Sequence, residues 1–209
     1  DGEQFKPALD LLSEPRRELY ILELSSFQLE TTERLGAQTA TLLNLSEDHM
    51  DRYESFDSYW QAKQKIFAGC NQVLINRDDS KSIPSLCEVV SKLEFGLGDP
   101  RSLDLGVREE EGLEYLVYGD QRITRVDELN VVGQHNVANV LAAAGLAITL
   151  GIEISTIHKA ITKFTGLAHR CQWAGEKQGV DFYNDSKGTN VGATVAAIEG
   201  LAKKVKGQV

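Results

Sequence analysis

Apolar positions along the chain form short strand-like runs that alternate with stretches of helical spacing. Residues 18–24, 38–45 and 72–76 have the composition of buried strands. Residues 56–68 carry apolar side chains at helical spacing, and a shorter helix is expected over residues 7–12. Strands that alternate with helices predict an α/β fold with a mostly parallel central sheet flanked by helices.

The pattern changes over residues 93–126, where short β-prone runs are separated by turn residues. Glu111-Gly112 and Gly119-Asp120 are typical of hairpin turns. We therefore expect a small antiparallel β meander attached to the main sheet. Two helices should follow, over residues 137–150 and 155–164, the first opened by the segment 133–136.

The segment 165–170 breaks the helical pattern and is interpreted as a linker that acts as a hinge. A strand over 180–184, a loop over 185–190 and a helix over 191–201 come next. This order predicts the beginning of a second Rossmann-like α/β domain. The predicted organisation is a central domain over residues 1–166 and the start of a C-terminal domain over 167–209.

Composition narrows the class of protein. The chain has 209 residues, 42% of them hydrophobic, and a formal net charge of −9, which argues against a nucleic-acid partner. Its three cysteines lack metal-type spacing and are interpreted as reduced thiols of a cytoplasmic protein. No secretory signal is found, and the most apolar stretch, residues 137–150, is too short to cross a membrane.

Candidate chemistry begins where the second predicted strand ends. Residues 43–52 place the carboxylates of Glu47, Asp48 and Asp51 around His49. Ligands of α/β proteins bind where strands end, and carboxylate and imidazole groups bind divalent cations. Glu23 ends the first predicted strand and is expected to share a metal ion with His49. A charge at a fraying strand end and an ordinary surface histidine remain the alternatives.

Other residues suggest an anion or a nucleotide. Lys187 and Thr189 lie in the loop before the last helix, where backbone amides attract anions, although Thr189 is also a plausible N-cap. Asn136 and Asn139 share one helix face and can read an adenine edge or cap the helix. Lys63 and the pair His169-Arg170 can contact phosphate or remain solvated. The sequence has no Gly-Lys dipeptide, so it contains no Walker-type phosphate loop.

Several of these segments resemble the Mur ligases of bacterial cell-wall synthesis. They are residues 22–30, 44–53, Ala62-Lys63, residues 133–136 with Asn139, and residues 184–190. The last segment resembles the D-glutamate-adding branch of the family, and the likeness covers essentially the whole chain. It departs from the family at residues 1–5, where Asp-Gly-Glu-Gln-Phe stands in place of a Gly-Asn-Ile-Gly-like turn. It is left open whether Glu3 or Gln4 replaces the asparagine.

The resemblance implies an ATP-dependent ligase of peptidoglycan synthesis. ATP would phosphorylate the carboxylate of UDP-N-acetylmuramoyl-L-alanine, and the amine of D-glutamate would displace the phosphate. It further implies a cytoplasmic monomer with small-molecule partners and with no nucleic-acid or membrane partner. Because the family's N-terminal domain, phosphate loop and complete C-terminal domain are missing from this sequence, the chain alone is expected to be inactive.

The resemblance also assigns roles to residues. Two Mg²⁺ ions would be held with the help of Glu23, His49 and Lys63, with a carbamylated Lys63 bridging one of them. Lys63, His49 and Lys187 would be catalytic, and Ser25, Ser26 and Thr189 would face the substrates. ATP would be bound by Asn136, Asn139, His169, Arg170 and Asp185.

Three other functions compete with this interpretation. One is a ligase similar to folylpolyglutamate synthase. Another is a metal-dependent phosphohydrolase that uses Glu23, Asp48, His49 and Asp51. The third is a non-catalytic nucleotide-binding or interaction fragment.

Overall fold

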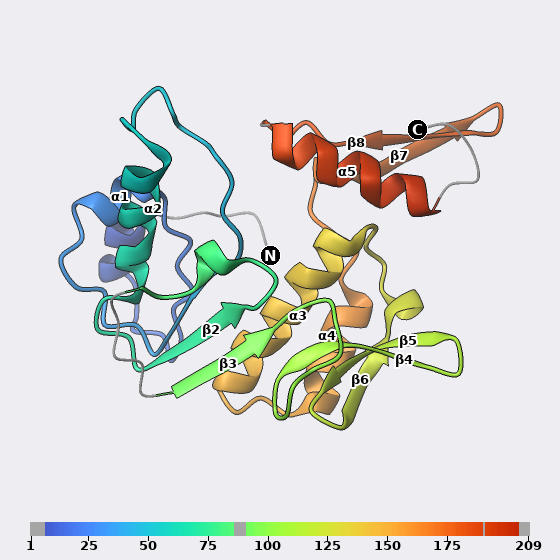
Figure 1. Ribbon diagram of the computed structural model, residues 1–209, viewed down its shortest axis with the longest axis horizontal. Helices are drawn as coiled ribbons and strands as arrows, with labels where there is room; N and C mark the ends of the chain where they lie inside the picture. Colours follow the sequence, from blue (N-terminus) through green and yellow to red (C-terminus); the bar gives the residue numbers. More distant parts are fainter. Residues whose placement is uncertain (1–6, 86–90, 190, 205–209) are drawn as a thin grey trace.

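A computed structural model describes residues 7–85, 91–189 and 191–204 of the chain, and it has the α/β fold predicted from the sequence (Figure 1). The segment 1–5, where the sequence departs from the family, lies outside the described residues. In chain order the elements are η1 (Ala8–Ser13), α1 (Ser26–Glu30), β1 (Thr39–Leu42), α2 (Phe56–Gln64), η2 (Lys65–Phe67), β2 (Gln72–Asn76), η3 (Ser80–Ser82), β3 (Ser91–Phe95), β4 (Leu105–Glu110), β5 (Leu113–Tyr118), β6 (Gln121–Arg125), η4 (Val126–Glu128), α3 (Gln134–Thr149), α4 (Ile154–Lys163), β7 (Gln172–Lys177), β8 (Val180–Asn184) and α5 (Val191–Lys204).

One six-stranded sheet organises most of the chain, with the strand order β1-β2-β3-β4-β5-β6. β1, β2, β3 and β4 pair in parallel, whereas β4, β5 and β6 form an antiparallel meander. The predicted turns at Glu111-Gly112 and Gly119-Asp120 lie between the strands of this meander. The mixed sheet is therefore confirmed.

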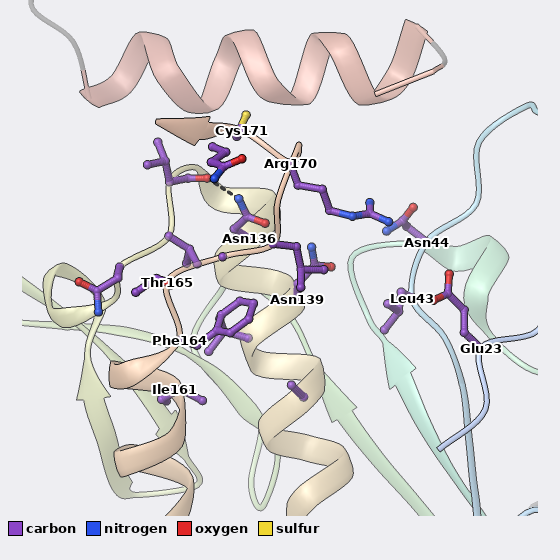
Figure 2. A pocket seen from close by; sticks show the side chains of 18 of the residues that line it. Glu23, Leu43, Asn44, Asn136, Asn139, Ile161, Phe164, Thr165, Arg170 and Cys171 are labelled. Atoms are coloured by element: carbon purple, nitrogen blue, oxygen red, sulfur yellow. Dashed lines mark hydrogen bonds between the residues drawn. The ribbon is translucent and has the colours of Figure 1, made fainter. Parts of the chain in front are cut away.

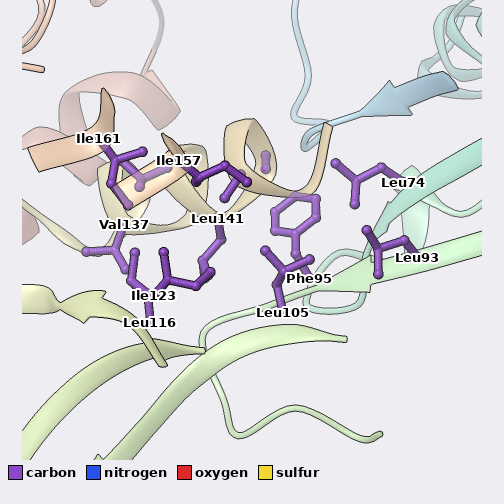
Figure 3. Packing of buried hydrophobic residues seen from close by; sticks show 13 residues of the cluster. Leu74, Leu93, Phe95, Leu105, Leu116, Ile123, Val137, Leu141, Ile157 and Ile161 are labelled. Atoms are coloured by element: carbon purple, nitrogen blue, oxygen red, sulfur yellow. The ribbon is translucent and has the colours of Figure 1, made fainter. Parts of the chain in front are cut away.

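Helices cover both faces of the parallel part of the sheet. On one face, α3 and α4 pack on the strands through a core that includes Leu74, Leu116 and Leu141, each fully buried (Figure 3). On the other face, α2 and η2 close a second core around Val73, Ile75, Tyr59 and Phe67. β2 is therefore buried on both faces, which explains why its sequence is continuously apolar.

The strand predicted over residues 18–24 is wrong. This segment belongs to no strand of the sheet, and the side chain of Ile21 is 84% exposed. An apolar run has the composition of a strand, but a strand also needs a neighbour to complete its hydrogen bonds and a layer to cover its side chains. In the described structure β1 is the edge of the sheet, and residues 18–24 do not join it.

Two further differences concern strand pairing. The segment 91–95, taken in part as meander, is β3 and pairs in parallel with β2. In the C-terminal part, β8, the loop after it and α5 appear as predicted, but β8 pairs with an unpredicted antiparallel strand, β7. β7 reads Gln-Trp-Ala-Gly-Glu-Lys, and its exposed side chains leave little apolar pattern for sequence reasoning to detect.

Arg77 fixes the unusual step from β3 to β4. These strands pair in parallel at one position, Phe95 with Leu105, and no helix connects them. The Arg77 guanidinium donates hydrogen bonds to the carbonyl oxygens of Leu105 at 2.7 Å, Gly98 at 2.5 Å and Gly96 at 3.3 Å. One cation thus satisfies three backbone acceptors where the sheet changes from parallel to antiparallel.

Replacing Arg77 should therefore destabilise the fold. Arg77→Met keeps much of the apolar stem but removes a donor from three carbonyl oxygens, of which that of Gly98 still accepts from the Val107 amide. We therefore expect the free energy of unfolding to fall by about 2–4 kcal/mol. Urea denaturation followed by circular dichroism measures this loss. Arg101→Met, at an exposed site in the same connection, is the control and should change stability by less than about 0.5 kcal/mol. Equal stabilities of the two variants would contradict this role of Arg77.

Candidate functional site

A cavity of about 1390 Å³ lies between the C-terminal end of β1, the helices α3 and α4, and the segment after α4. It exceeds the usual range for small-molecule sites and has both polar and apolar walls. Figure 2 shows side chains from these separate parts of the chain around it. Among the predicted site residues, those that line it are Glu23, Lys63, Asn136, Asn139 and Arg170.

Polar side chains at the end of β2 and just after it hold the segment leaving β1. The Asn76 side chain donates to the Leu43 carbonyl oxygen at 2.7 Å, and the Leu45 amide donates to the Asp79 carboxylate at 2.7 Å. These bonds fix the backbone on both sides of Asn44, which lines the cavity. Arg170 points toward Asn44 from the other side (Figure 2). The sequence reasoning gave Asn44 no role, although its position directly after a strand was a usable signal.

Lys63 occupies an unusual electrostatic position. It lies in α2, its side chain is partly buried, and burial lowers the pKa of its ammonium group. The carboxylates of Glu23 and Asp48 act in the opposite direction and raise this pKa. The net shift is downward, so deprotonation of this amine costs less than for a solvated lysine. Two anionic groups from separate segments therefore face one partly buried lysine.

His49 is held in the same region but does not line the cavity. Its backbone is left-handed, with φ 56°, and its carbonyl oxygen accepts hydrogen bonds from the amides of Arg52 and Tyr53. The side chain is 44% exposed, and its Nε2 atom lies 3.9 Å from the Asp48 carboxylate. Phe27 and Tyr59 pack against the ring. Sequence reasoning assigned these two aromatic residues no role.

The donor types around Lys63 suit a divalent cation. Carboxylates of Glu23 and Asp48, the imidazole of His49 and, after carbamylation, Lys63 are groups that bind Mg²⁺ or Mn²⁺. Within residues 7–85, 91–189 and 191–204, no three His, Cys, Asp or Glu side chains already converge as a metal site. A carbamate on Lys63 would add an anionic donor to this set.

The two asparagines of α3 differ in their contacts. The Asn136 side chain donates to the Val132 carbonyl oxygen at 2.7 Å, so it braces the turn that begins the helix. Asn139 lies one turn later, is exposed and lines the same cavity. The capping interpretation of Asn136 is therefore wrong, because the N-cap of α3 is Gly133 and has no side-chain cap bond. Asn139 retains an amide directed at the cavity (Figure 2).

α4 ends at Lys163, just before the predicted linker of residues 165–170. The second half of this linker is hydrogen-bonded to the end of β8 and to the loop after it. The amide of Cys171 donates to the Asp185 carboxylate at 2.9 Å, and the amide of Lys187 donates to the His169 carbonyl oxygen at 3.1 Å. A side-chain hydrogen bond of 2.9 Å also joins Asn184 and His169. The segment 169–171 is therefore tied to the loop 184–187, which leaves residues 164–167 as the connection.

The remaining predicted residues lie outside the main cavity. Lys187 and Thr189 are exposed, and Thr189 lines a second, smaller cavity of about 410 Å³. Ser25 caps α1, where its hydroxyl accepts from the Gln28 amide at 3.3 Å, and Ser26 is buried beside it. The structure thus gives Ser25 a structural task and leaves its predicted contact with substrate as an expectation.

The fold is shared with known ligases. The MurF ligase of Acinetobacter baumannii matches 79% of this chain with a TM-score of 0.62 at 21% identity, and the match spans 37% of that protein. The UDP-N-acetylmuramate–alanine ligase MurC of Thermotoga maritima matches 86% with a TM-score of 0.61 at 21% identity, over 39% of its own length. At this identity the likeness shows the fold alone.

Sequence comparison shows the family as well as the fold. The UDP-N-acetylmuramoylalanine–D-glutamate ligase of Pseudomonas syringae pv. tomato is 50% identical over 203 residues, which are 97% of this chain. The chain spans 45% of that relative's length. Residues 5–147 match the family described as the Mur ligase middle domain. With its parallel sheet and antiparallel meander, the chain belongs to the Mur ligase family.

Proposed function

We propose that the chain is part of an ATP-dependent ligase that joins D-glutamate to UDP-N-acetylmuramoyl-L-alanine in peptidoglycan synthesis. In this proposal residues 1–166 belong to the ATP-binding central domain, and residues 167–209 begin the C-terminal domain. The substrates are small molecules, and the enzyme works as a cytoplasmic monomer without a nucleic-acid or membrane partner. The 50% identity to a D-glutamate ligase supports this choice of substrate.

The observation that carries the proposal is the environment of Lys63. The side chain is partly buried at the wall of a large cavity, with a lowered pKa and with Glu23 and Asp48 as its electrostatic partners. Carbon dioxide reacts only with a neutral amine, so a lowered pKa favours carbamylation. The product is an anion, which turns a lysine that repels a metal ion into a ligand that holds one.

The proposed reaction has two steps. The substrate carboxylate attacks the γ-phosphorus of ATP, which forms an acyl phosphate and releases ADP. The amine of D-glutamate then attacks the carbonyl carbon, phosphate leaves, and the nitrogen loses a proton to give the amide. Mg²⁺, when bound, neutralises the phosphate oxygens and the charge that develops between the two anionic reactants. Glu23, His49 and the Lys63 carbamate would hold it.

The nucleotide would lie along α3 and under the C-terminal segment. Asn139 would contact adenine, while Asn136 would maintain the turn that presents it. Arg170 would contact phosphate, and because His169 and Asp185 are hydrogen-bonded within the same unit, these residues would move together. Rotation about residues 164–167 would then bring Lys187 and Thr189 from their exposed positions toward the substrates.

The other candidate functions have less support. A phosphohydrolase that uses Glu23, Asp48, His49 and Asp51 would not account for the match of residues 5–147 to the Mur ligase middle domain. A ligase similar to folylpolyglutamate synthase would not account for 50% identity to a D-glutamate ligase. A purely nucleotide-binding fragment remains compatible with the cavity, and it is separated from a ligase by the activity of the longer protein.

Lys63 should carry a carbamate under physiological bicarbonate. In ¹³C-bicarbonate at pH 8, we expect the chain to give a carbamate carbon signal that disappears in Lys63→Arg, because arginine does not form it. Lys65→Arg is the matched control, since Lys65 is exposed on the same helical segment and bonds the Glu30 carbonyl oxygen. A signal that persists in Lys63→Arg would place the carbamate elsewhere.

In the full-length ligase, Lys63→Ala should lose at least about 99% of the activity, because a ligand to the metal ion is missing. Acetate or formate should restore part of it by occupying the vacant carboxylate position. The measurement is phosphate release that depends on both D-glutamate and the UDP-linked substrate. Rescue by methylamine, without rescue by carboxylates, would show that Lys63 acts as a cation on phosphate.

The 209-residue chain should not form the amide by itself, because its sequence has no phosphate loop. We expect no product from ATP, Mg²⁺, D-glutamate and UDP-N-acetylmuramoyl-L-alanine when the reaction is followed by mass spectrometry. The full-length ligase under identical conditions is the positive control. Product formed by the isolated chain would show that the reaction does not need a Walker-type phosphate loop.

A further inference from the structure

We infer that Tyr59 is the positioning residue that sets the orientation of the His49 imidazole relative to Lys63. The inference rests on the proposed function, in which His49 and Lys63 contribute to one metal–phosphate centre. The packing of the Tyr59 ring carries this inference.

Tyr59 lies between the two candidate metal-binding residues. Its ring meets the His49 ring edge-on, with centroids 6.4 Å apart and an interplanar angle of 71°. The Lys63 Nζ atom lies 5.8 Å from the centre of the same ring. Tyr59 and Lys63 are four residues apart in α2 and therefore project from one face of the helix. The Tyr59 ring therefore packs against the His49 ring and also lies close to the Lys63 ammonium group.

The Tyr59 ring is itself rigidly held. It is 6% exposed and belongs to the core closed by α2 and β2. Tyr53 packs on it at 5.3 Å between centroids, and Phe56 does so at 6.2 Å. A buried ring that is fixed on several sides is a suitable support for a mobile neighbour.

His49 needs such a support. It is 44% exposed on a loop, and its Nε2 atom is 3.9 Å from the Asp48 carboxylate, which is longer than a hydrogen bond. A histidine ligand is normally oriented by a hydrogen bond from its second ring nitrogen. Here ring packing performs this task, from Tyr59 and from Phe27, whose centroid lies 4.9 Å from that of His49.

The test measures Mn²⁺ affinity of the chain, loaded with bicarbonate, by electron paramagnetic resonance. Tyr59→Leu should weaken binding about tenfold, in the range seen when a group that orients a metal ligand is removed. Tyr59→Phe keeps the ring and should stay within about twofold of the original chain. Val73→Ala, which shrinks a residue of the same core but removes no ring packed on Tyr59, is the control for general loosening and should also stay within about twofold.

A double-mutant cycle separates positioning from a merely structural role. If Tyr59 acts through His49, then Tyr59→Leu should have less than a twofold effect on Mn²⁺ affinity in a His49→Ala background. A tenfold effect in both backgrounds, or an equal loss in Val73→Ala, would overturn the inference.

An NMR measurement tests the positioning without any metal. In Tyr59→Leu, the nuclear Overhauser effects between the His49 and Phe27 rings should fall by at least about half, because the imidazole has lost one of its two packing partners. Unchanged effects would overturn the inference even if the variant bound Mn²⁺ weakly. Absence of Mn²⁺ binding by the original chain would instead contradict the metal role in the proposed function, and the NMR result would then decide the positioning alone.

Discussion

The candidate site depends on how the backbone leaves β1. The parallel pairing of β1 with β2 sets the position of the strand end, and the side chains of Asn76 and Asp79 then bind the backbone at Leu43 and Leu45. These contacts convert a loop, which would otherwise be mobile, into a fixed wall of the cavity. The histidine loop and α2 follow directly, so an error in this strand end would displace His49 and Lys63 together.

Burial and charge act against each other at Lys63, and this balance gives the site its chemistry. The second core draws α2 onto β2, and Lys63 of α2 is partly buried. The same packing brings the amine near Glu23 and Asp48. A fully solvated lysine would remain protonated. A buried lysine with no carboxylate nearby would lack the oxygen ligands that a metal ion needs. The intermediate position favours a reactive amine beside carboxylates.

Sequence reasoning succeeded where periodicity is local. The run 72–76 gave β2 with its observed bounds, and the turn residues at 111–112 and 119–120 gave the meander, because these signals depend only on neighbouring residues. It failed for residues 18–24 and for β7, where strand formation depends on a partner elsewhere. Within the site, Glu23 lines the cavity although the strand that it was expected to end does not form, and Lys63 was named through the family resemblance. Tyr59 could not be named from the sequence, because its role depends on the ring of His49 ten residues away in sequence.

The proposed function depends on Glu23, His49 and Lys63 forming one cation-binding centre. The most direct measurement is paramagnetic broadening of backbone amide signals by Mn²⁺ in the ¹⁵N-labelled chain with bicarbonate. We expect the amides of Glu23, His49 and Lys63 to broaden first and to recover when excess Mg²⁺ competes. Broadening that begins instead at the acidic turn of residues 109–111, with these three amides unaffected, would contradict it.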